Sequence, residues 1–139
     1  MTPEEVARKS VAALWAEDHT AKEHGIHIES VGPGRAALSM ALTKAMTNGH
    51  GIGHGGFIFL LADTAFAYAC NSYNQRCVAQ HCAITYLRPA KRGSRLRAEA
   101  RELQRIDRSG IYDISVTDET GAAIAEFRGH SRTVPGSLF

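Results

Sequence analysis

The feature that most constrains the fold is a glycine-rich polar loop that runs directly into an apolar segment with a single carboxylate. Residues 48–56 are Asn-Gly-His-Gly-Ile-Gly-His-Gly-Gly, and residues 57–67 are Phe-Ile-Phe-Leu-Leu-Ala-Asp-Thr-Ala-Phe-Ala. This pattern predicts a helix from about Gly55 to Cys70 that is apolar on nearly every side. Such a helix has to be enclosed by protein, so the rest of the chain is expected to cover it.

Predicted strands and one further helix flank this central helix. The segment 2–5, Thr-Pro-Glu-Glu, is typical of a helix N-terminus and predicts a helix over 3–17. Strands are expected at 26–31, 36–42, 77–87, 95–105, 110–117 and 123–132. The last four are evenly spaced, which indicates an antiparallel meander. The sequence therefore predicts an α+β fold in which a curved antiparallel β-sheet wraps around one long central helix, with an N-terminal helix beside it.

Composition restricts the class of protein and its partners. The chain has 139 residues, of which 44% are hydrophobic, and this fits one domain over residues 1–139. Sixteen basic and fourteen acidic residues give a formal net charge of +2, too small a surplus to indicate nucleic-acid binding. No segment has the pattern of a signal peptide or a membrane span, and three cysteines without CxxC spacing favour reduced thiols. We expect a cytoplasmic protein with neither a nucleic acid nor a membrane as partner.

The start of the central helix is a candidate oxyanion site. The first amide groups of a helix have no partner inside it and carry the positive end of the helix dipole. Glycine at positions 55 and 56 would let a substrate approach this backbone closely. The same glycines could serve only loop geometry and close packing, and the local sequence leaves both interpretations open.

Asp63 is the second candidate for chemistry. A carboxylate among leucine, alanine and phenylalanine is costly to bury as an anion unless hydrogen bonds or an opposite charge compensate it. A nucleophile or general base would explain its position. The structural alternative is a carboxylate held by Thr64 or by a neighbouring helix end.

The spacing of these two elements has a consequence for assembly. Asp63 lies eight residues beyond Gly55, which is about 12 Å along a helix that rises roughly 1.5 Å per residue. One bound carbonyl cannot contact both groups of the same helix. Two such helices packed antiparallel would bring the Asp63 of each near the Gly55 of the other. The spacing therefore predicts a homodimer as the catalytic unit.

The other polar groups of the loop suit hydrogen bonding better than metal binding. Glycines separate His50 from His54, and no carboxylate or thiol lies nearby in the sequence, so we expect no metal site. Asn48 could orient a nucleophile or water, and His54 could fix the loop or contact the substrate. A cysteine nucleophile is not expected either, because the sequence around the three cysteines lacks the electropositive setting that lowers a thiol pKa.

The central motif resembles one known family. Asn-Gly-His-x-x-x-His-Gly-Gly at 48–56 and Leu-Ala-Asp-Thr-Ala-Phe-Ala-Tyr-Ala-Cys-Asn-Ser at 61–72 are similar to the hotdog-fold acyl-coenzyme A thioesterases of the PaaI type, from phenylacetic acid degradation. The likeness extends through 85–89, 110–114 and 127–129. It implies a sheet wrapped around the helix, two chains that form one continuous sheet, and a homotetramer made of two such dimers.

The resemblance also implies roles for particular residues. The family's catalytic carboxylate falls on Asp63 and its carbonyl-polarising amide on Gly55, and the two act from opposite subunits. The supporting asparagine and histidine fall on Asn48 and His54. Some relatives place a hydroxyl on the strand after the helix, where this sequence offers Gln80 as the nearest substitute.

The implied reaction is hydrolysis of an aryl acyl-coenzyme A thioester, with phenylacetyl or a ring-hydroxylated phenylacetyl as the acyl group and no cofactor. The residues expected to contact the acyl group or the coenzyme A phosphates are Gly56, Phe57, Leu61, Phe66, Arg88, Lys91, Arg92 and Arg128. Ordinary core packing is the alternative for the apolar residues of this set, and a solvated face for the basic ones. Two other functions compete: an enoyl-coenzyme A hydratase or dehydratase of the same fold, and a non-catalytic acyl-coenzyme A-binding protein.

Overall fold

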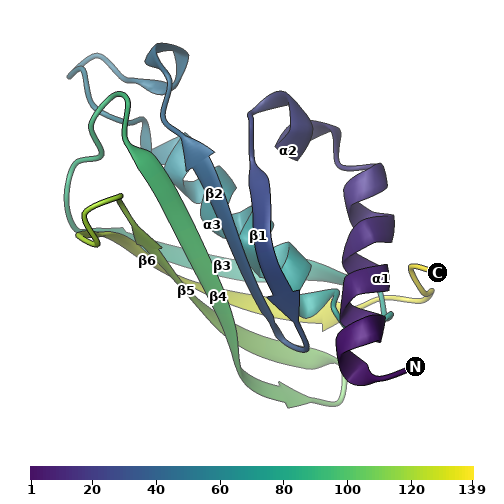
Figure 1. The fold of residues 1–139 in the computed structure, drawn as a ribbon. Helices are drawn as coiled ribbons and strands as arrows, with labels where there is room; N and C mark the ends of the chain where they lie inside the picture. The colour runs from purple at the N-terminus through teal and green to yellow at the C-terminus, as the bar shows by residue number, and fades with distance from the viewer.

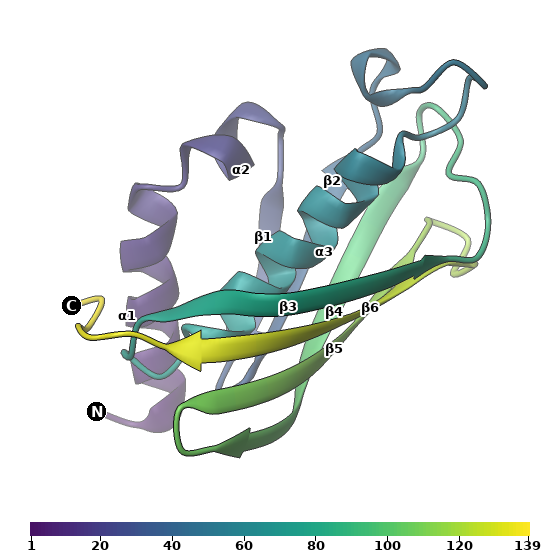
Figure 2. The same ribbon diagram turned by 180° about the vertical axis from the view of Figure 1, so that it is seen from behind.

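One long helix lies across a curved, six-stranded antiparallel sheet in a computed structural model that describes residues 1–139 (Figures 1 and 2). The elements in chain order are α1 (Pro3–Ala16), α2 (His19–Glu23), β1 (His27–Gly32), β2 (Arg35–Ala41), the 3-10 turn η1 (Lys44–Met46), α3 (Gly55–Cys70), β3 (Cys77–Tyr86), β4 (Arg95–Ile106), β5 (Ser109–Thr117) and β6 (Ala123–Thr133). The expected hotdog arrangement and the N-terminal helix are confirmed. None of the helices has the length and apolar character needed to cross a membrane.

The order of the strands corrects one prediction. The sheet order is β1-β2-β4-β5-β6-β3, so β4, β5 and β6 form the expected meander but β3 does not belong to it. β3 pairs with β6 at the far edge of the sheet, because α3 carries the chain across the sheet between β2 and β3 (Figure 2). Even spacing along the sequence cannot reveal this, since the position of β3 in the sheet depends on where the chain emerges from α3.

Local sequence signals account for several boundaries. The Thr2 hydroxyl accepts a hydrogen bond from the Glu5 amide at 3.2 Å, which caps α1. β1 and β2 are joined by a tight turn in which Gly34 has a φ of +68°, a conformation that glycine adopts without steric cost. A bulge interrupts β3 between Ala79 and His81, and it shifts which later side chains face the helix.

The core forms between α3 and the inner face of the sheet. Most of α3 is buried, as the apolar sequence predicts, but one stripe remains partly exposed in the single chain: Gly56, Phe59, Leu60, Asp63 and Ala67. These positions repeat every three or four residues and therefore share one side of the helix. The rest of the chain thus covers the Asp63 side of α3 only in part.

Candidate active site

The N-terminus of α3 presents one backbone donor without a partner. His54 is the N-cap, and its Nδ1 accepts a hydrogen bond from the Gly56 amide at 2.9 Å. The amides of Phe57 and Ile58 both donate to the His54 carbonyl, at 3.0 and 3.4 Å. The Gly55 amide donates to no acceptor in the chain. A helix N-terminus with one free amide is suited to bind a carbonyl oxygen or an oxyanion.

Asn48 organises the loop that leads to this helix. Its Oδ1 accepts hydrogen bonds from the His50 amide at 2.9 Å and from the Ile52 amide at 3.4 Å. Its backbone amide donates to the Ile52 carbonyl at 2.8 Å. The two N–H groups of its side-chain amide form no hydrogen bond, so they are available to a ligand. His50 is exposed and takes part through its backbone.

Gly55 and Asn48 line the same cavity, which has a volume of about 350 Å³. Its other walls are Ile52, Gly53, Ile58, Tyr86, Leu87, Arg88, Pro89 and Ala90. The Tyr86 hydroxyl donates to the Gly55 carbonyl at 2.8 Å, and a Cβ on residue 55 would lie 3.0 Å from the Tyr86 ring. Tyr86 was absent from the residues predicted from sequence. Its position at the end of a strand gave no local sign of this contact.

Asp63 lies in a separate cavity of about 250 Å³ on the partly exposed side of α3. Burial raises the pKa of this carboxyl above its usual value, while a hydrogen bond from Cys82 opposes that effect. The Cys82 Sγ lies 3.9 Å from Asp63 Oδ1 and is the carboxylate's one side-chain partner. Burial and the neighbouring carboxylate raise the pKa of Cys82 to about 11. A carboxylate with so little compensation remains available as a base or nucleophile.

Gln80, the nearest substitute for the hydroxyl of some relatives, does not contact Asp63, and Cys82 on the same strand does. Gln80 is exposed, at the bulge of β3. In a regular strand, residues 79 and 82 point to opposite faces. The bulge adds one residue between them, so Ala79 and Cys82 both face the helix. Sequence alternation therefore could not have identified Cys82.

A single chain holds two half-sites. The cavity that contains Gly55 and the cavity that contains Asp63 share no lining residue. Both border β3, the first at Tyr86 and the second at Val78 and Ala79.

The basic candidates divide into two groups. Arg88 lines the Gly55 cavity, and Lys91 and Arg92 are exposed on the loop that follows it; none of the three forms an ion pair. Arg128 instead donates to both oxygens of Asp113, at 2.7 and 2.9 Å, and borders a different cavity. The structure therefore does not bring Arg128 to the other three.

The apolar candidates are mainly core residues. Leu61 is 0% exposed and Phe66 is 1% exposed. Phe66 packs against Tyr112 and also lines the Asp63 cavity, whereas Leu61 lies wholly in the core, so the expectation of a substrate contact is wrong for Leu61 in the single chain. Phe57 is half buried, with its ring 5.6 Å from that of His24.

Comparison with known proteins defines the family. The model of the thioesterase superfamily matches residues 50–125, which is more than half of the chain and includes Gly55 and Asp63. The chain belongs to the thioesterase superfamily. Within that family it is similar to the acyl-coenzyme A thioesterase PaaI of Escherichia coli (strain K12), with 41% identity over 132 residues that cover 95% of this chain and 94% of the relative.

Solved structures agree with this assignment. The structure of the E. coli PaaI protein from the phenylacetic acid degradation operon matches with a TM-score of 0.96 and 40% identity, and the match covers 98% of this chain and 99% of that one. A mutant of the phenylacetic acid degradation protein PaaI from Thermus thermophilus matches with a TM-score of 0.80 and 32% identity, over 83% and 98% of the two chains.

Replacement of Asp63 by asparagine is expected to increase the free energy of unfolding at about pH 7, because it removes a half-buried charge that has one thiol as partner. The folded protein raises the pKa of Asp63, so the cost of ionisation is present above the folded pKa and disappears as the pH falls below about 4. Urea unfolding at fixed protein concentration across this pH range measures the difference.

The matched control is Asp113→Asn. Arg128 lowers the pKa of Asp113, so this variant should lose stability at about pH 7 and approach the parent protein in acid. Equal signs for the two variants at neutral pH would contradict the assignment of Asp63 as an under-compensated carboxylate.

Proposed function

We propose that the protein hydrolyses aryl acyl-coenzyme A thioesters, with phenylacetyl-coenzyme A or a ring-hydroxylated phenylacetyl-coenzyme A as substrate. The observation that carries this proposal is the pair of half-sites: a free amide at Gly55 and an under-compensated carboxylate at Asp63. The E. coli relative is named an acyl-coenzyme A thioesterase, and its solved structure is described as a product of a phenylacetic acid degradation operon. The first description supports thioester hydrolysis, and the second supports a phenylacetyl acyl group.

The complete site is formed by two copies of the chain. β3 is an edge strand, paired with β6 alone, so its outer side offers unpaired backbone groups. The Gly55 half-site borders the Tyr86 end of β3, and the Asp63 half-site borders the Val78 end. Antiparallel pairing of β3 with the same strand of a second copy therefore joins unlike half-sites at both ends of the paired strands.

The exposed stripe of α3 supports the same dimer. The partly exposed side of the helix carries Phe59, Leu60 and Ala67 beside Asp63. Within one helix, Asp63 lies about 12 Å from Gly55. A second α3 packed antiparallel on this side would bury apolar surface and bring the Asp63 of each chain close to the Gly55 of its partner. Two such dimers would form the homotetramer that the family resemblance implies.

The chemistry follows from the two groups. The Gly55 amide, at the positive end of the helix, donates to the thioester carbonyl oxygen and stabilises the negative charge that develops there. Asp63 either attacks the carbonyl carbon or takes a proton from an attacking water, and in both cases the coenzyme A thiolate leaves. Direct attack leaves the acyl group on Asp63 as a mixed anhydride, which water then hydrolyses to the free acid and the restored carboxylate. Asn48, through its free side-chain N–H groups, orients the carbonyl or the water. Single turnover in isotope-labelled water distinguishes the two roles of Asp63: water activated by a general base puts its label in the product acid, whereas water that opens an anhydride at the Asp63 carboxyl carbon puts the label in Asp63 and leaves a carboxylate oxygen in the product.

Thiol release from a panel of aryl and alkyl acyl-coenzyme A esters tests the proposal. We expect aryl esters to have the highest kcat/KM, and Asp63→Asn to lower kcat by about 10²–10⁴-fold. The oxyanion role is tested by Gly55→Pro, which deletes the N–H while the helix tolerates proline at its first position. His54 before it is already extended, with ψ of 131°, as a residue before proline requires.

Gly55→Ala is the matched control, since it adds a Cβ near Tyr86 but keeps the N–H. We expect Gly55→Pro to have a kcat about 10²–10³-fold below that of Gly55→Ala. Equal kcat values for the two variants would remove Gly55 from the mechanism, and binding of the esters without thiol release in the parent protein would indicate a non-catalytic acyl-coenzyme A-binding protein.

Subunit mixing tests the shared site. A heterodimer of Gly55→Pro and Asp63→Asn chains has one site with both defects and one intact site. Random reassembly of an equal mixture should therefore restore about a quarter of the parent activity, since half of the dimers are mixed and each has one working site. Mixing two Asp63→Asn chains is the control. No recovery in verified heterodimers would show that both groups act from one chain.

The phosphate contacts are tested by alanine at Arg88, Lys91 and Arg92, one at a time. Each cation lies at or beside the Gly55 cavity without an ion-pair partner. We expect KM for coenzyme A esters to rise about two- to fivefold, as is usual for exposed charge pairs, with no change for the matching pantetheine ester. Arg128→Ala is the matched control because Asp113 already pairs with it. Equal effects on both esters would reject the phosphate role.

A further inference from the structure

Two cysteines lie on either side of the loop that joins α3 to β3. Cys70 is the last residue of α3 and Cys77 the first of β3. Asn71 holds the two segments together: its Nδ2 donates to the Ala67 carbonyl at 2.9 Å and to the Cys77 carbonyl at 3.1 Å, and its Oδ1 accepts from the Cys77 amide at 2.9 Å. The same Nδ2 lies 3.6 Å from the Cys70 Sγ. The loop is therefore closed at its base by Asn71, which contacts the Cys70 sulfur and the Cys77 backbone.

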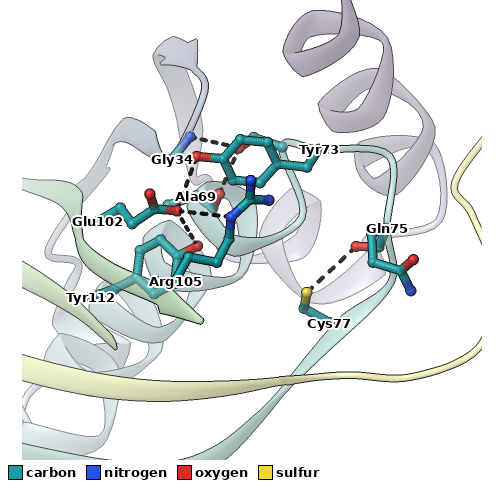
Figure 3. A network of polar contacts seen from close by, with 9 residues as sticks. Gly34, Ala69, Tyr73, Gln75, Cys77, Glu102, Arg105 and Tyr112 are labelled. Atoms are coloured by element: carbon teal, nitrogen blue, oxygen red, sulfur yellow. Dashed lines mark hydrogen bonds and ion pairs between the residues drawn. The ribbon is translucent and has the colours of Figure 1, made fainter. Parts of the chain in front are cut away.

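Both cysteines line the same two cavities. One is the cavity that contains Asp63. The other, which we call the thiol cavity, has a volume of about 410 Å³. Its walls are Cys70, Tyr73, Gln75, Cys77, Arg105, Asp107, Ser109, Tyr112, Ser131 and Thr133. Arg105 is the positive charge of this cavity (Figure 3).

A polar network fixes that positive charge. The Arg105 guanidinium stacks on the Tyr73 ring at 3.4 Å from its centroid and forms an ion pair with Glu102 at 3.8 Å (Figure 3). Glu102 also accepts hydrogen bonds from the hydroxyls of Tyr73 and Tyr112, at 3.0 and 2.9 Å. The guanidinium is therefore held on one wall of the thiol cavity, with Cys77 on another.

The two thiols are inequivalent. The neighbouring Cys70 thiol is the main cause that lowers the pKa of Cys77, and the charge of Arg105 lowers it further, against the effect of burial. The neighbouring Cys77 and burial both raise the pKa of Cys70. The Cys77 Sγ lies 3.5 Å from the Gln75 carbonyl oxygen (Figure 3), and the Cys70 Sγ lies 3.5 Å from the Ala67 carbonyl oxygen. The expectation that no cysteine has an electropositive setting is therefore wrong for Cys77, because Arg105 approaches it from a strand distant in sequence. Of the two, Cys77 is the thiol that loses its proton more readily, and Cys70 is the one that keeps it.

We propose that Cys77 and Cys70 form a reversible oxidation site for hydroperoxides. The Cys77 thiolate attacks the terminal OH oxygen of the peroxide; the O–O bond breaks, hydroxide leaves from hydrogen peroxide or an alkoxide from an organic hydroperoxide, and Cys77 becomes a sulfenic acid. The Cys70 sulfur then attacks the sulfur of Cys77, the S–O bond breaks, and water leaves with the proton of Cys70. The product is a Cys70–Cys77 disulfide, and the peroxide is reduced by two electrons. A small thiol reductant restores both cysteines by exchange.

Oxidation would act on the Asp63 half-site, and this consequence rests on the proposed function. Both sulfurs belong to the wall of the Asp63 cavity, so a disulfide between them changes the shape of that wall. We expect thioester hydrolysis to slow severalfold in the oxidised protein and to recover with dithiothreitol. We expect no oxidation of Cys82, because burial and the neighbouring Asp63 raise its pKa to about 11.

Peptide mapping of the full-length protein after treatment with hydrogen peroxide tests the proposal. We expect a peptide pair linked through Cys70 and Cys77 with the loss of two hydrogens, reversal by dithiothreitol, and an unmodified Cys82. In Cys70→Ser the sulfenic acid of Cys77 should persist and form an adduct with dimedone. In Cys77→Ser, neither disulfide nor adduct should form at Cys70.

Arg105→Gln tests whether the positive charge of Arg105 promotes the oxidation of Cys77, as distinct from general thiol oxidation. It should slow oxidation of Cys77 severalfold, whereas Arg108→Gln, a matched change on the neighbouring turn outside the thiol cavity, should not. Oxidation of Cys82 before Cys77, equal dimedone labelling of all three cysteines, or equal rates in the two arginine variants would overturn the proposal. The masses are read without any activity assay, so a disulfide in a protein without thioesterase activity would contradict only the proposed function. A disulfide that leaves the hydrolysis rate unchanged would contradict the link to Asp63.

Discussion

The packing of α3 against the curved sheet is the constraint on which the rest of the structure depends. The helix is apolar on nearly every side, so the sheet has to curl around it to remove that surface from water. The same packing fixes both chemical groups. It exposes the helix N-terminus, where the Gly55 amide has no partner, and it leaves Asp63 on the side of the helix that the chain covers only in part. Helix α3 thus fixes the distance between the two half-sites of one chain.

The edge strand β3 connects these half-sites to each other and to the rest of the fold. Tyr86 at its end donates to the Gly55 carbonyl, Cys82 in its middle contacts Asp63, and Cys77 at its start lines one cavity with Arg105. One strand therefore borders both half-sites and the thiol cavity. Its outer side has no partner strand within the chain, which is why a dimer through this edge and a complete site belong to the same proposal.

Patterns within short segments predicted the fold well, and pairings between distant segments could not be predicted the same way. The helix start at residues 2–5 and the apolar run of α3 are local signals, and both are confirmed. The meander failed at β3 because a helix crossing decides its neighbour. Leu61 was predicted as a pocket residue because residue type alone does not distinguish an apolar residue that lines a pocket from one in the core.

The sequence by itself determined the central helix, the glycine loop before it, the spacing of Gly55 from Asp63 and the resemblance to thioesterases, because each is a property of a short contiguous segment. Only the tertiary structure decided which groups meet. The Cys82 contact depends on a bulge, the Tyr86 contact on the far end of an edge strand, and the setting of Cys77 on Arg105 from another strand. Contacts of this kind arise from chain crossings over long sequence separations, and no local pattern encodes them.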